Sequence, residues 1–154
     1  MMITKTAQET VKFGKDIAKY IRPKDVIALV GELGCGKTTL VKGIAEGLGV
    51  KNANYVNSPS FVLIREHKGR TNLYHLDLYR LDNISDIEGL GMEEYFYSDG
   101  VTVIEWAEKA EGLLPQEYLR IEIDILGGDC RQITLKSFGK RYENISSRYV
   151  DKNN

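Results

Sequence analysis

The stretch Asp25-Val-Ile-Ala-Leu-Val-Gly-Glu-Leu-Gly-Cys-Gly-Lys-Thr38 decides the fold of this 154-residue chain. It opens with a continuous apolar run, which is typical of a strand buried on both faces of a parallel sheet. A glycine-rich turn follows. The residues from Lys37 to Leu48 then have the pattern of a helix, and Gly49 is a plausible end for it. Strand, tight turn and helix in this order predict an α/β fold.

The turn from Gly31 to Thr38 matches the phosphate-binding pattern G-x-x-x-x-G-K-[ST] without mismatch. Glycines let the backbone aim successive N–H groups at phosphate oxygens, and the N-terminus of the following helix attracts the same anion. In such loops the lysine, here Lys37, reaches the β- and γ-phosphates, and the following hydroxyl, here on Thr38, binds Mg²⁺. The turn therefore predicts a nucleotide site.

The rest of the chain adds helices and strands around this unit. Thr6 and Glu9 have the spacing of a capping box, and apolar residues then recur at helical spacing to Ile21. The other expected elements are strands 61–67, 72–80, 101–105, 118–126 and 130–138, one or two short helices within 83–97, and a helix over 140–149. Together they predict one domain over residues 1–154, a P-loop NTPase-like α/β sandwich with a mixed parallel and antiparallel sheet.

Two acidic residues are candidates for the metal side of the site. Phosphate loops use a carboxylate near a neighbouring buried strand to hold Mg²⁺. Glu105 ends the apolar run 101–105, and Asp77 shares a strand face with His75 and Tyr79. That polar face is either a sheet edge that meets water or a face turned to the nucleotide. In the second case Asp77 would bind Mg²⁺ through water or orient the attacking water.

Three residues near these motifs allow more than one interpretation. Trp106 follows Glu105 and is either a core residue or a neighbour of the nucleotide that senses its state. Cys35 lies beside a helix N-terminus, which lowers the pKa of a thiol; the position suits a small filler residue better than a redox role. Arg80 could stabilise the transition state, but strand alternation puts it on the face opposite Asp77. The pattern therefore favours an arginine supplied by a partner.

Composition narrows the class of protein. Hydrophobic residues make up 42% and charged residues 28% of the chain, which is ordinary for a globular protein. The longest apolar run has five residues, Val26 to Val30, whereas a membrane span needs about 20. Neither a signal peptide nor a disulfide framework nor a zinc constellation is visible. We expect a cytoplasmic protein without membrane association.

Charge is unevenly distributed along the chain. The net charge is −1, yet residues 82–124 carry 12 Asp/Glu and two Lys/Arg. This segment is either a solvated acidic face or a docking surface for a basic partner. The overall balance gives no support for a large nucleic-acid footprint on this chain alone.

Four motifs occur in a recognisable order: Gly31-Glu-Leu-Gly-Cys-Gly-Lys-Thr-Thr39, Ser58-Pro-Ser-Phe61, His75-Leu-Asp-Leu-Tyr-Arg80 and Val103-Ile-Glu-Trp106. In this order they resemble the TsaE family (formerly YjeE), the ATPase of bacterial tRNA threonylcarbamoyladenosine biosynthesis. The resemblance covers essentially the whole chain. It implies a P-loop α/β domain that binds ATP with Mg²⁺ and hydrolyses it weakly when alone. It also implies TsaB and TsaD as partners. TsaD transfers a threonylcarbamoyl group to the adenosine beside the anticodon, so tRNA would be met indirectly through that complex.

The resemblance further implies roles for particular residues. Lys37, Asp77 and Glu105 would be catalytic, and Thr38 and Glu105 would be the Mg²⁺ ligands. The nucleotide-binding set would be Leu33, Gly34, Cys35, Gly36, Lys37, Thr38, Thr39 and Arg131.

Two further segments take their roles from the same resemblance. Residues 58–61 would form a mobile, switch-like segment, in which Ser60 stands where threonine is more usual and keeps the hydroxyl. Contacts to adenine would come from the segment Thr6 to Gln8 and from the hairpin near Arg131.

Other functions compete with a regulatory ATPase. A P-loop small-molecule kinase shares the loop and the Mg²⁺ chemistry. It would need an acceptor pocket and usually an arginine-bearing lid, but segment 82–124 is acidic and would repel an anionic acceptor. A GTPase would need an Asn-Lys-x-Asp segment to read guanine, and the sequence has none. A module that holds nucleotide without turnover would have less use for Lys37, Asp77 and Glu105 together.

Overall fold

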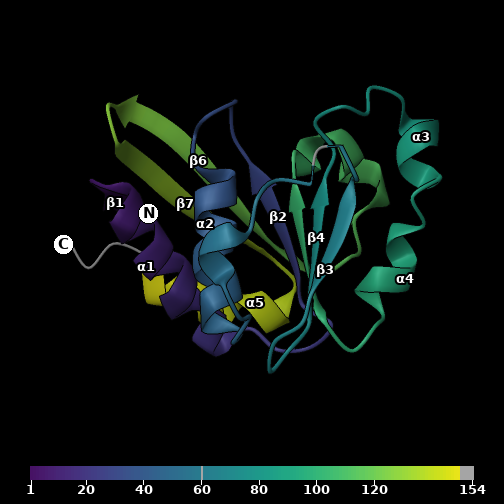
Figure 1. The fold of residues 1–154 in the computed structure, drawn as a ribbon, viewed down its shortest axis with the longest axis horizontal. Helices are drawn as coiled ribbons and strands as arrows, with labels where there is room; N and C mark the ends of the chain where they lie inside the picture. Colours follow the sequence, from purple (N-terminus) through teal and green to yellow (C-terminus); the bar gives the residue numbers. More distant parts are fainter. Residues whose placement is uncertain (60, 150–154) are drawn as a thin grey trace.

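The computed structural model describes residues 1–59 and 61–149, and in these residues seven strands form one sheet in the order β1-β7-β6-β2-β5-β4-β3 (Figure 1). The central strands β6, β2, β5 and β4 are parallel, whereas β3, β7 and β1 pair antiparallel with their neighbours. The sheet is therefore mixed, as the sequence predicts. The strands are β1 Met2–Thr4, β2 Val26–Val30, β3 Ile64–His67, β4 Leu73–Asp77, β5 Val101–Glu105, β6 Tyr118–Gly127 and β7 Cys130–Phe138.

The α-helices agree with the expected pattern in number and position. The α-helices are α1 Ala7–Ile17, α2 Lys37–Gly47, α3 Ile84–Glu88, α4 Met92–Phe96 and α5 Lys140–Ser146; the short 3-10 helices are η1 Ala18–Tyr20, η2 Ala53–Tyr55, η3 Ala107–Leu113 and η4 Ser147–Tyr149. The predicted cap at Thr6 is present, since its hydroxyl accepts a hydrogen bond from the backbone N–H of Glu9 at 3.1 Å.

The sequence patterns missed three elements, β1, η2 and η3, and η2 has only three residues. β1 has three residues, too few for a period, and it is a strand because it pairs with β7, with Met2 opposite Ile133. η3 is irregular, with a non-helical backbone at Ala110, so its residues do not follow a helical repeat. Strand β1 and helix η3 both make contacts with distant parts of the chain.

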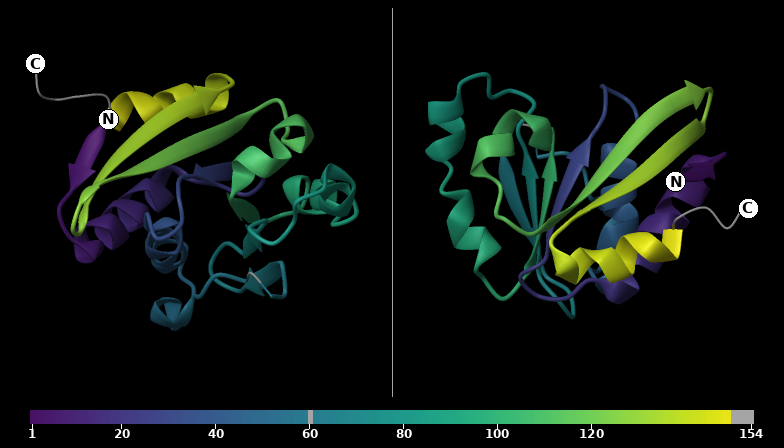
Figure 2. Two further views of the ribbon diagram at one scale, coloured as in Figure 1. Left: turned by 90° about the horizontal axis from the view of Figure 1, so that it is seen from above. Right: turned by 180° about the vertical axis from the view of Figure 1, so that it is seen from behind.

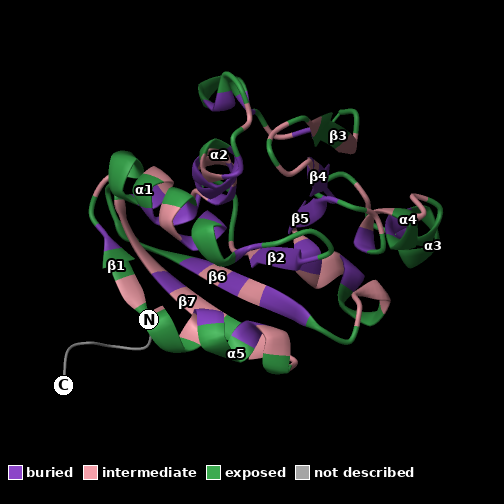
Figure 3. Cartoon of the chain, turned by 90° about the horizontal axis from the view of Figure 1, so that it is seen from below, coloured by how far each residue is buried: buried purple, intermediate pink, exposed green. Residues whose placement is uncertain are grey.

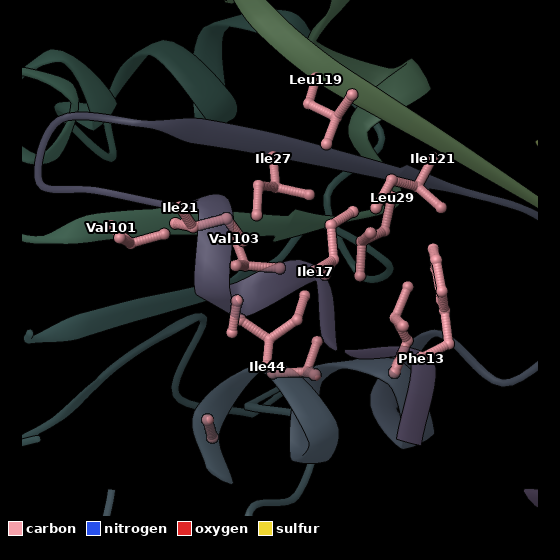
Figure 4. Packing of buried hydrophobic residues seen from close by; sticks show 14 of the residues in the cluster. Phe13, Ile17, Ile21, Ile27, Leu29, Ile44, Val101, Val103, Leu119 and Ile121 are labelled. Atoms are coloured by element: carbon pink, nitrogen blue, oxygen red, sulfur yellow. The ribbon is translucent and has the colours of Figure 1, made fainter. Parts of the chain in front are cut away.

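Two apolar layers enclose the sheet. Helices α1 and α2 lie side by side over one face, where Ile17 and Ile44 meet Ile27 and Leu29 of β2 (Figures 1 and 4). Helices α3, α4 and η3 cover the other face, against alternate residues of the same strands. The central strands are therefore buried on both sides (Figure 3), as the apolar run of β2 predicts. Viewed from behind, α5 lies across the lower end of the sheet (Figure 2, right), where the Tyr142 hydroxyl accepts from the backbone N–H of Val26 at 2.9 Å.

Glycines allow the close approach of α1 to α2. This packing also fixes the position of α2, which begins where the glycine-rich loop ends. A Cβ added at Gly43 of α2 would lie 2.1 Å from the carbonyl oxygen of Val11, and one at Gly14 of α1 would lie 2.5 Å from that of Leu40. Backbone atoms cannot move aside as a side chain can, so the two helices would have to separate.

We expect Gly43→Ala to lower the free energy of unfolding by about 2 kcal/mol, because overpacking exceeds the helix-propensity gain of about 1 kcal/mol. Urea unfolding followed by circular dichroism measures it. Gly112→Ala is the control, because a Cβ there meets nothing within 4 Å. Equal stability of both variants would contradict the packing argument.

In the part of the chain that the structure describes, no helix is both long enough and apolar enough to cross a membrane.

Candidate functional site

The carboxyl ends of β2, β5 and β4 meet at one edge of the sheet, where a cavity of about 380 Å³ opens. Ligands of open α/β sheets bind at this edge. The predicted site residues gather here, Arg131 excepted; the lining is Leu33, Gly34, Cys35, Gly36, Lys37, Thr38, Thr39, Ser58, Asp77, Tyr79, Arg80, Glu105 and Trp106. A larger hollow of about 800 Å³, around Arg22 and Glu117 at the opposite end of the sheet, contains none of them.

The loop from Gly31 to Thr38 connects β2 to α2 and forms one wall of the cavity. Gly34 and Gly36 have φ values of 77° and 109°, in the left-handed region that glycine adopts without strain. Gly36 caps α2 without a side chain, so the first N–H groups of the helix stay available for an anion.

Lys37, the first residue of α2, is 5% exposed and is turned back onto its own loop. Its Nζ donates to the carbonyl oxygens of Gly31 at 2.5 Å and Glu32 at 3.0 Å, and it lies 4.0 Å from the ring centroid of Trp106. The ammonium is thus held at the cavity wall by two backbone dipoles and an aromatic face.

The two predicted metal ligands are in direct contact. The Thr38 hydroxyl lies 2.9 Å and 3.1 Å from the two carboxylate oxygens of Glu105 and donates to this carboxylate. His75 is fully buried, and its Nε2 lies 2.8 Å from Glu105 Oε1. His75 is therefore a hydrogen-bonded sheet residue, and it fixes the orientation of Glu105 from behind.

Asp77 ends β4 and joins two segments of the cavity wall. One carboxylate oxygen accepts from the backbone N–H of Tyr79 at 2.8 Å, and the other accepts from the hydroxyl of Ser58. The alternative of a sheet edge open to water is wrong, because β4 lies between β5 and β3 and Asp77 is 2% exposed. Ser60, the substituted residue of the switch-like segment, lies outside the described residues.

Arg80 lines the same cavity as Asp77, so the expectation of opposite faces is wrong. Strand alternation ends with β4 at Asp77. The backbone then turns, with the N–H of Leu81 donating to the carbonyl of Leu78 at 3.0 Å. The sequence signal for this turn is the aspartate itself, whose side chain bonds the backbone two residues later.

Trp106 lies between a core layer and the cavity, and its role as a sensor of the nucleotide stays a prediction. It packs against the apolar layer under α3 and α4, and it also lines the cavity between Lys37 and Tyr79, whose ring centroid is 5.0 Å away. Its backbone is left-handed, with a φ of 59°. A non-glycine residue in this conformation directly after Glu105 is typical of a functional site.

Cys35 and Arg131 support the outer side of the loop. Cys35 is 1% exposed, and burial raises the pKa of its thiol, whereas its place beside a helix N-terminus predicted a lowered pKa. Arg131 of β7 donates from Nε to the carbonyl of Cys35 at 2.7 Å. Arg131 therefore buttresses the loop; a hollow of about 40 Å³ beside it is also lined by Ala7 and Thr10.

The comparisons with known proteins point to one family. Residues 4–133 match the family described as "Threonylcarbamoyl adenosine biosynthesis protein TsaE". The chain belongs to the TsaE family. The chain is 47% identical over 141 residues to the tRNA threonylcarbamoyladenosine biosynthesis protein TsaE of Bacillus subtilis, which covers 91% of this chain and 87% of that one. The TsaE of Treponema pallidum is 37% identical, over 86% and 97%.

A solved structure has the same fold as this chain. The crystal structure of YdiB from Bacillus subtilis matches with a TM-score of 0.81 and 40% identity, over 97% of this chain and 95% of that one. The mixed α/β architecture that the sequence predicts is therefore also that of YdiB, and membership of the TsaE family assigns the chain to threonylcarbamoyladenosine biosynthesis.

Proposed function

We propose that the protein is a Mg²⁺-dependent ATPase subunit for threonylcarbamoyl modification of tRNA, acting in the cytoplasm with TsaB and TsaD. The single observation that carries the proposal is the meeting of Lys37, Thr38, Asp77 and Glu105 in one cavity at the carboxyl edge of the sheet. A lysine, a hydroxyl and two carboxylates are the groups that phosphoryl transfer requires.

Phosphate binding would use the loop and the start of α2. The N–H groups after Gly34 and Gly36 would bind the phosphate oxygens, because no side chain at either position obstructs them. Lys37 would exchange its two backbone carbonyl partners for the β- and γ-phosphates, which are stronger acceptors for an ammonium than a neutral carbonyl.

The acidic side of the cavity fits Mg²⁺. A hydroxyl and a buried carboxylate in contact are hard oxygen donors, and Mg²⁺ bound to a nucleotide takes one or two such ligands besides phosphates and water. Thr38 and Glu105 would hold the ion, which supplies charge neutralisation at the β- and γ-phosphates. Asp77 would orient the attacking water, since it is buried at the same cavity and tied to Ser58.

Dependence on partners would follow from the resting contacts of the site. Lys37 is bound to its own loop, and Ser58 ties the switch-like segment to Asp77. Each contact must break before the phosphates and water are bound, so we expect slow turnover by the isolated chain. A partner that binds more tightly to the form in which these contacts are broken would accelerate turnover. The acceleration is set by the difference between its binding free energies for the two forms.

The test is ATP hydrolysis by the purified chain with Mg²⁺, alone and then with TsaB, TsaD and substrate tRNA. We expect stimulation of at least about tenfold, the effect of about 1.4 kcal/mol in the barrier. TsaB and TsaD without the chain are the control. Fast turnover by the chain alone, or phosphate appearing on a small-molecule acceptor, would contradict the proposal, and the second result would favour the small-molecule kinase.

A further inference from the structure

Among the described residues, Arg80 is the one arginine that lines the cavity at the carboxyl ends of β2, β5 and β4. Its side chain is exposed to the cavity, and among residues 1–59 and 61–149 it takes part in no salt bridge. A guanidinium at a phosphate-type site without an acidic partner is available to an incoming anion.

The backbone on both sides of Arg80 is fixed. Lys109 of η3 donates from Nζ to the carbonyl oxygens of Tyr79 at 2.6 Å and Leu81 at 3.2 Å. Asp77 accepts from the N–H of Tyr79 at the start of the same turn. These three bonds hold the turn, so the Arg80 side chain leaves the backbone from a defined point beside Asp77.

The side chain of Arg80 is held by the switch-like segment. Its guanidinium carbon lies 3.9 Å from the ring centroid of Phe61, a residue that is 82% exposed. Stacking uses the face of the guanidinium plane, whereas its N–H bonds point outward in that plane. The Phe61 ring therefore orients the Arg80 side chain and leaves its N–H donors available for an anion.

We propose that Arg80 is a catalytic residue of ATP hydrolysis and that Phe61 is its positioning residue. In the reaction the water oxygen bonds to the γ-phosphorus while the bond to the β,γ-bridging oxygen breaks. ADP keeps that electron pair, and the water proton passes to the Asp77 carboxylate. Arg80 donates to the γ-phosphoryl oxygens, whose charge it stabilises as the bond breaks. The chain thus carries its own arginine, and this inference rests on the proposed function.

A transition-state analogue tests the inference apart from turnover. The complex with ADP and Mg²⁺ contains no mimic of the transition state. Aluminium fluoride added to this complex mimics the transferring phosphoryl group. Affinity for ADP is measured by calorimetry with and without aluminium fluoride, for the full-length chain and for Arg80→Lys and Arg80→Ala. The matched control is Arg148→Lys, because Arg148 also stacks on an aromatic ring, 4.4 Å from the Tyr20 centroid, far from the cavity.

We expect both Arg80 variants to bind ADP with an affinity within about twofold of that of the unaltered chain. In both variants aluminium fluoride should no longer increase the affinity for ADP, because the arginine acts on the transferring group. The kcat of both variants should fall about a hundredfold, with KM little changed. This loss is smaller than the 10³–10⁵ in rate that an arginine finger contributes, because lysine or water replaces part of the arginine's charge. Phe61→Leu should show an intermediate loss, and Arg148→Lys none. Unchanged thermal unfolding would exclude a folding defect.

Two results separate the failures. If the unaltered chain binds neither ADP nor ATP, the proposed function itself is wrong. A different result would overturn only the role of Arg80. In that case the unaltered chain hydrolyses ATP, Arg80→Lys has a kcat within about threefold of the unaltered value, and aluminium fluoride still increases the affinity of this variant for ADP.

Discussion

Lys37→Ala is expected to reduce ATP turnover by a hundredfold or more, to the background of the assay. Removing one preorganised charge donor from a transition state costs about 10²–10³ in rate, and Lys37 would serve two phosphates. The side chain is 5% exposed and bonds two carbonyls of its loop. Its loss therefore also removes the group that the resting loop is folded around.

Lys42→Ala provides the control for this prediction, because Lys42 lies on the same helix α2 but does not line the cavity. Turnover and nucleotide affinity are measured for both variants, with thermal unfolding as a check on the fold. Lys42→Ala should match the unaltered chain. Turnover by Lys37→Ala at the unaltered rate would exclude this cavity as the ATPase site.

Glu105→Gln is expected to raise the Mg²⁺ concentration needed for half-maximal turnover by more than about tenfold. Loss of a residue that only supports a metal ligand costs 10–100-fold in affinity, and Glu105 would be a ligand itself. The amide keeps the size of the side chain and one acceptor oxygen for His75 and Thr38. The charge is lost while the packing of β5 is kept.

The readout has two parts, a Mg²⁺ titration of turnover and a Mg²⁺ titration of Trp106 fluorescence in the presence of ADP. Trp106 follows Glu105 and lines the cavity, so its emission reports the site without turnover. Glu111→Gln is the control, since Glu111 is an exposed residue of η3 that pairs with Arg120. An unchanged Mg²⁺ requirement in Glu105→Gln would remove Glu105 from the metal site.

Local patterns predicted most of the fold. The apolar run of β2, the hairpins β3–β4 and β6–β7 and the helices α1, α2 and α5 each have a period or a turn signal within a few residues. The same holds for the glycine-rich loop, because the spacing of its glycines determines the backbone conformation of the loop. Strand β1 lacked such a signal, since three residues become a strand by pairing with β7, more than 120 positions away in the chain.

The sequence by itself determined which groups the site contains: a phosphate-type loop with Lys37 and Thr38, and the carboxylates Asp77 and Glu105. Only the tertiary structure decided their arrangement. Parallel pairing of β2, β5 and β4 brings the strand ends together, and this pairing puts Thr38 against Glu105. Arg80 is the clearest case, because alternation along β4 predicts the opposite face. The turn after Asp77, held by distant Lys109, reverses that direction. Spacing encodes what lies within one element, whereas directions after a turn depend on bonds between elements.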